Sequence, residues 1–70
     1  MSEEIVTQLE KIDAPYGRKL VFESVEHASD MHLLRIRIRE GGRFTVLDID
    51  KETALRWIAV MTAWANEPLH

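Results

Sequence analysis

Residues 33–49 read LLRIRIREGGRFTVLDI, and this stretch decides the fold. Apolar and polar residues alternate on both sides of a central Gly-Gly pair, which is typical of two β-strands, 31–40 and 43–49, joined by a two-residue turn. Such a turn requires positive φ, which glycine adopts without steric cost, so we expect positive φ at both Gly41 and Gly42. The stretch therefore predicts a β-hairpin.

The two faces of this hairpin differ in character. If Glu40 and Arg43 flank the turn, Ile36 lies across from Leu47, and the neighbouring positions on that face are also apolar. The opposite face carries three arginines at alternate positions of the first strand, Arg35, Arg37 and Arg39. One face therefore predicts a hydrophobic core, and the other predicts a basic surface.

The chain before the hairpin adds a third strand at 18–26, rich in aliphatic residues. Pairing Phe22 with Ile36 keeps large apolar residues on the core face, whereas a shift by one residue would turn charged side chains into the core. An Ala-Pro-Tyr-Gly turn signal at 14–17 precedes this strand. Residues 3–12 fit a strand or a helix, with β-branched residues favouring the strand.

The chain after the hairpin predicts one helix, 51–66. Asp50 is a helix N-cap residue, and Pro68 marks the end of the helix. At 100° per residue the apolar positions cover roughly 220°, about twice the arc that packing on one sheet requires. The fold class is therefore α+β: an antiparallel meander of three to four strands followed by one C-terminal helix packed on the sheet, in a single small domain over 1–70.

The wide apolar arc predicts a second packing partner for the helix. We expect one side of the helix to complete a core that consists of Leu20, Phe22, Leu34, Ile36, Ile38, Leu47, Ile49, Leu55, Ile58 and Met61. The other side predicts a homodimer interface made of Trp57, Val60, Met61 and Trp64, because two exposed tryptophans would form a large apolar patch on a monomer. The alternative is that residues 3–12 fold back over the tryptophans.

Length and composition restrict the class of protein. A chain of 70 residues without cysteine has a small core and no disulfides, so burial against a second chain is the remaining way to gain stability. The net charge of −3 gives no overall attraction for nucleic acid. With an acidic N-terminus and no long apolar run, we expect a cytoplasmic protein without a membrane partner.

The basic face is the most informative surface. Its candidate nucleic-acid-binding residues are Lys19, Arg35, Arg37, Arg39, Arg43 and Phe44. Guanidinium groups beside an exposed ring suit single-stranded nucleic acid, because the cations meet phosphates and the ring stacks on bases. The same register places Glu23 and Asp48 beside Arg35, and such cross-strand pairs also stabilise ordinary sheets.

Other chemistry-bearing residues have simpler interpretations. His27, Asp30 and His32 include metal-ligand side chains, but their spacing matches no standard site and a fourth ligand is missing. Asp48 and Asp50 are interpreted as a cross-strand partner and a helix cap rather than an acid–base pair. We expect no catalytic residue, metal or cofactor, and hence a protein that is not an enzyme.

The order of four strands and one helix, with RFTVLDID at 43–50 leading into the helix, resembles the positive coactivator four family of single-strand-binding proteins. The resemblance implies a curved antiparallel sheet that presents basic and aromatic residues, with helices pairing two chains. The chain also looks like a short bacterial protein of unassigned function. We therefore expect a small binding domain for single-stranded nucleic acid; the alternative is a protein-interaction or assembly module.

Overall fold

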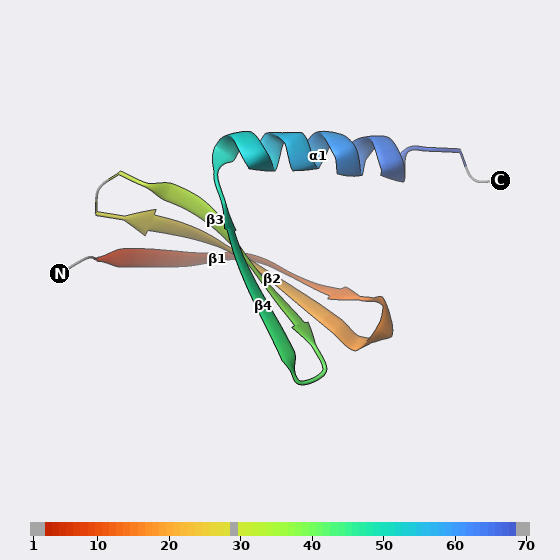
Figure 1. Ribbon diagram of the computed structural model, residues 1–70, viewed down its shortest axis with the longest axis horizontal. Helices are drawn as coiled ribbons and strands as arrows, with labels where there is room; N and C mark the ends of the chain where they lie inside the picture. The colour runs from red at the N-terminus through yellow and green to blue at the C-terminus, as the bar shows by residue number, and fades with distance from the viewer. Residues whose placement is uncertain (1–2, 29, 69–70) are drawn as a thin grey trace.

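The computed structural model describes residues 3–28 and 30–68, and it has one open sheet followed by one helix (Figure 1). The strands are all antiparallel and lie in the order β1-β2-β3-β4. The expected α+β class is therefore confirmed. In chain order the elements are β1 (Glu4–Ala14), the short 3-10 turn η1 (Pro15–Gly17), β2 (Arg18–His27), β3 (His32–Glu40), β4 (Arg43–Ile49) and α1 (Lys51–Ala65).

The register of the central hairpin follows from its alternating sequence. Ile36 pairs with Leu47 on one side and with Phe22 on the other, as predicted. Gly41 has a φ of 60°, but Gly42 has no positive φ, so the expectation of positive φ at both glycines is wrong. Positive φ at the first central residue alone is the pattern of a type II′ turn, which suits the right-handed twist of the strands.

The N-terminal segment is an edge strand. β1 pairs with β2 along its length, with an irregularity between Gln8 and Glu10 that matches a β-bulge. Of the two possibilities left open for residues 3–12, the structure has the strand. The alternative in which this segment covers the tryptophans is therefore wrong, because its backbone is engaged at the edge of the sheet.

Helix α1 begins directly after β4. The Asp50 carboxylate accepts a hydrogen bond from the backbone N–H of Thr53 at 2.9 Å. Hydrogen bonding by Thr53, first through its side chain and then through its backbone N–H, holds the pKa of Asp50 below its usual value. The helix ends at Ala65, and the backbone N–H of the C-cap residue Asn66 donates to the carbonyl of Thr62. Capping at both ends is local chemistry, which is why the sequence predicts the bounds of the helix closely.

The helix packs on the sheet only near its start. Ala54 is half-buried, whereas Leu55, Ile58 and Met61 are 66%, 58% and 57% exposed. Figure 1 shows α1 leaving β4 and running away from the strands toward its C-terminal end. The prediction that these three residues complete the core is therefore wrong. A single residue, Asp50, joins strand and helix, so the direction of the helix axis follows from the end of β4.

The buried core is small and is divided between the two faces of the sheet. Its members are Val25, Ile36 and Ile49, with exposed fractions of 0%, 4% and 8%. The predicted core residues Leu20, Phe22, Leu34 and Ile38 are half-buried, and Leu47 is 40% exposed. Val25 was not predicted, because it alternates onto the arginine face. It lies between Val6 and Leu33 on the neighbouring strands, which enclose it.

Candidate functional site

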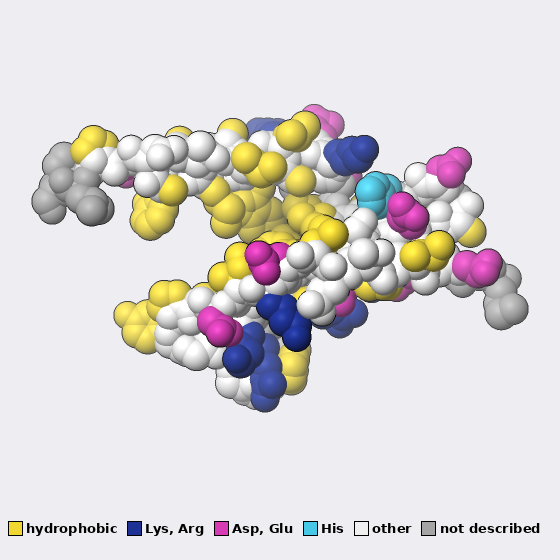
Figure 2. Space-filling view, turned by 180° about the vertical axis from the view of Figure 1, so that it is seen from behind, with side chains coloured by type: hydrophobic (Ala, Val, Ile, Leu, Met, Phe, Trp, Pro, Cys, Tyr) yellow, Lys and Arg dark blue, Asp and Glu magenta, His cyan; other side chains and the backbone are white. Residues whose placement is uncertain are grey.

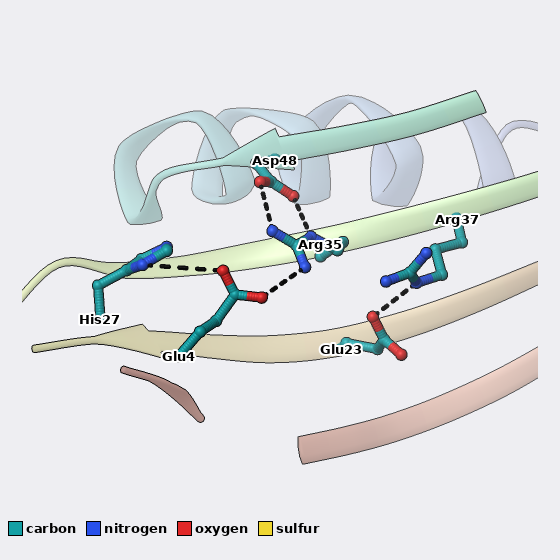
Figure 3. A network of polar contacts seen from close by, with 6 residues as sticks. All are labelled: Glu4, Glu23, His27, Arg35, Arg37 and Asp48. Atoms are coloured by element: carbon teal, nitrogen blue, oxygen red, sulfur yellow. Dashed lines mark hydrogen bonds and ion pairs between the residues drawn. The ribbon is translucent and has the colours of Figure 1, made fainter. Parts of the chain in front are cut away.

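Arg35 is the centre of an ion-pair network on the basic face of the sheet (Figure 3). Its Nε and Nη2 donate to Oδ1 and Oδ2 of Asp48 at 2.8 and 3.1 Å, and its Nη1 donates to Oε1 of Glu4 at 3.0 Å. The two bonds to Asp48 form the paired geometry in which a guanidinium group best binds a carboxylate. The Arg35 side chain is only 15% exposed, so it offers little to a ligand.

The network also affects protonation. The hydrogen bonds that Arg35 donates to Asp48 and then to Glu4 raise the pKa of Arg35 above its usual value. The hydrogen bond from Arg35 is the main reason that the pKa of Asp48 is lowered. Both side chains are therefore charged throughout the neutral range, and their pairing does not depend on pH there.

The next cations on this face are also paired. Arg37 Nε donates to Oε1 of Glu23 at 2.8 Å, and Lys19 Nζ lies 3.2 Å from Oδ1 of Asp13. Glu23 lies opposite Arg35 in the register, as predicted, but its carboxylate accepts from Arg37 rather than from Arg35. Much of the basic surface that the sequence predicts is therefore neutralised by carboxylates.

The hairpin end of this face keeps a cation and a ring together. The guanidinium group of Arg39 lies 5.6 Å from the centroid of the Phe44 ring, which is 69% exposed. Arg43 pairs in register with Glu40 and thus projects from the opposite face. Among residues 3–28 and 30–68, the ion pairs of the structure include neither Arg39 nor Arg43. Of the predicted nucleic-acid site, only Arg39 and Phe44 combine exposure with proximity.

A second cation–ring pair lies at the turn between β1 and β2. Arg18 lies 5.6 Å from the centroid of Tyr16, a residue that is 91% exposed and has a φ of 67°. Arg18 also bonds Glu40 across the sheet at 2.7 Å. Hairpin turns of an antiparallel meander alternate between its ends, so this turn and the Gly41 turn lie at the same end. Sequence reasoning missed this pair, although the Pro-Tyr-Gly turn was a signal that Tyr16 is exposed.

The histidines do not form a cluster. His27 Nδ1 lies 3.9 Å from Oε2 of Glu4, while His32 Nε2 is 2.7 Å from Oγ of Ser24. Strand alternation places these two histidines on opposite faces of the sheet. Across the described part of the chain, no three side chains of metal-ligating type come together. Ser29, in the same loop, lies outside the described residues.

An apolar cleft between the sheet and α1 is the second candidate surface. Its closed end is a pocket of about 150 Å³ with Leu9, Leu34 and Ile49 on the sheet side and Ala54 on the helix side. Figure 2 shows that the space between helix and sheet is open and that hydrophobic side chains lie on both of its sides. The cleft therefore has two apolar walls and no segment of the described chain between them.

The residues predicted as a dimer interface lie along α1, beyond the pocket at the start of the helix. Val60, Met61 and Trp64 are 69%, 57% and 74% exposed, and Trp57 is half-buried. Residues 57–65 contain no charged side chain. A helical segment that is apolar on all sides is normally buried in proteins. Here every residue of the segment except Trp57 is exposed.

Within the described residues, α1 is the only helix of more than one turn, and it is not long and apolar enough to cross a membrane.

The comparisons with known proteins identify a family. No curated protein and no solved structure matches the chain, so the resemblance to the positive coactivator four family receives no support. A family model matches residues 3–67, nearly the whole chain. The chain thus belongs to DUF6967, a family of unknown function.

Proposed function

We propose that the protein is a non-enzymatic protein-interaction module and that it binds through the apolar surface formed by α1 and the facing side of the sheet. The observation that carries this proposal is the exposure of large apolar side chains on one helix. Those more than half exposed there are Leu55, Ile58, Val60, Met61 and Trp64. Apolar patches of more than a few hundred Å² are uncommon on monomers and mark interaction sites.

The basic face is a weaker candidate for binding than the apolar surface, because its central cations are already paired. Arg35 and Arg37 are already bonded to carboxylates, so a phosphate would have to displace Asp48 or Glu23 to reach them. Such an exchange yields little free energy, because one charge-assisted pair replaces another. Binding through the helix requires no such exchange, since its apolar side chains leave water without losing a partner.

A site-specific photo-crosslinking experiment tests the proposal. A photoreactive amino acid replaces Val60 on α1, and the matched control places it at Lys11, an exposed position on β1. After irradiation in cells that express the chain, we expect a protein adduct from position 60 and much less from position 11. Absence of an adduct at position 60, or equal labelling at the two positions, would refute the proposal.

Single-stranded nucleic acid is a second candidate ligand, favoured by the placement of Arg39 over the exposed ring of Phe44. Base stacking on an aromatic ring contributes about 1–3 kcal/mol per base, and a nearby cation contacts phosphate. A titration with single-stranded oligonucleotides at low salt should give binding that Arg39→Glu abolishes and that the helix control Arg56→Glu leaves unchanged. If the unmodified chain does not bind at low salt, this second function is excluded.

A further inference from the structure

The apolar segment 57–65 of α1 has more sides to bury than one sheet can cover. At 100° per residue, Ile58 and Val60 project about 200° apart around the helix axis, and both are more than half exposed. If α1 closed onto its own sheet, one of these two sides would still face water. A helix inserted between two apolar walls buries both sides at once, and the cleft between α1 and the sheet supplies two such walls (Figure 2).

The surface area of the chain indicates how much is left uncovered. The chain exposes 6146 Å², whereas a folded monomer of 8.1 kDa exposes about 4,500 Å². The radius of gyration, 14.5 Å, likewise exceeds the roughly 11 Å expected for 70 residues. An excess of about 1,600 Å² per chain amounts to more than 3,000 Å² when two copies bury it together. That area falls within the range of obligate homodimers.

We propose that the occupant of the cleft is a second copy of this chain. In this homodimer, segment 57–65 of each α1 lies between the sheet and the α1 helix of the partner copy, and a two-fold axis relates the two insertions. The inference rests on the proposed function, because it names the partner for the same apolar surface. Each chain carries both the two-walled cleft and the uncharged segment. Two copies can therefore fill each other's cleft, and the assembly closes as a dimer with no unfilled cleft left for a third chain.

The mass and the contacts of the unmodified protein test this inference. Sedimentation equilibrium at about 10 μM should return twice the chain mass of 8.1 kDa. In a sample that mixes isotope-labelled and unlabelled chains, isotope-filtered NOE spectra should connect methyl groups of Ile58 and Met61 on one chain with those of Leu20 and Leu47 on the other. A folded monomer at about 100 μM would overturn the inference. So would a dimer whose intermolecular NOEs never join helix to sheet.

Two glutamate substitutions provide the matched comparison. Ile58→Glu places a charge inside the proposed interface and should raise the dimer dissociation constant by at least about 100-fold. Lys11→Glu introduces the same residue at an exposed position of β1, outside α1 and the cleft, and should leave the dissociation constant within about threefold of the native value. An Ile58→Glu chain that dimerises as tightly as the native chain would contradict the inference. Because this variant also risks unfolding, the NOE measurement on the native chain decides.

The photo-crosslinking experiment at position 60 separates this inference from the proposed function. An adduct with twice the chain mass supports both. An adduct with a different protein, together with a monomeric purified chain, overturns the second copy and keeps the interaction module. Absence of any adduct removes both.

Discussion

Val25→Ala should destabilise the fold more than its position on the arginine face suggests. Val25 is fully buried, so the substitution replaces a buried isopropyl group with a methyl group and removes two buried carbon atoms with their hydrogens. At about 0.8 kcal/mol for each buried group, the lost transfer free energy is about 1.6 kcal/mol. A residual cavity of roughly 50 Å³ adds about 1 kcal/mol at about 24 cal/mol per Å³. We therefore expect a loss of about 2–3 kcal/mol.

Val46→Ala is the matched control for this prediction. It is the same substitution on the same face of the sheet, but Val46 is 54% exposed, and the expected change is within about 0.5 kcal/mol. Both variants are measured by urea unfolding, followed by circular dichroism, at one fixed protein concentration. The fixed concentration keeps any contribution of chain association to the measured stability the same for both. Similar losses for the two variants, or less than about 0.5 kcal/mol for Val25→Ala, would show that Val25 is not a buried core residue.

Three further predictions follow from the hairpin, the core and the ion pairs. Gly41→Ala should lower stability by about 1 kcal/mol because the φ of Gly41 is positive, whereas Gly42→Ala should change it little; equal effects in thermal unfolding would contradict the type II′ turn. Ile36→Ala should cost about 2–5 kcal/mol in the same urea assay, and a loss below about 0.5 kcal/mol would place Ile36 outside the core. The lowered pKa of Asp48 contributes stability that is present above its unfolded pKa, near 3.9, and is lost as the pH falls through its lower folded value. Between pH 5 and pH 2, Asp48→Asn should therefore lose less stability than the native chain, and parallel pH profiles would contradict the pairing with Arg35.

The sequence by itself determined the local features of the fold. Alternation with a period of two, ending at Gly41 and Gly42, predicted the central hairpin and its register, because a slip by one residue would turn every apolar side chain to water. The register in turn placed Arg39 beside Phe44, the part of the candidate nucleic-acid site that the structure keeps exposed. The capping residue Asp50 predicted where α1 begins, since its hydrogen bond is made within one helical turn.

Tertiary structure alone decided the partners of charged groups and the position of the helix. Glu4 on β1 accepts a hydrogen bond from Arg35 on β3, with strand β2 between them. No periodicity in the sequence indicates a contact between strands that are not neighbours. Val25 is buried on a face that alternation assigns to charged residues, because its neighbours Val6 and Leu33 come from separate strands. The apolar arc of α1 specifies how much of the helix must be buried but not against which surface. The direction in which α1 extends from β4 determines which surface covers the helix, and in this direction most of the apolar arc remains exposed.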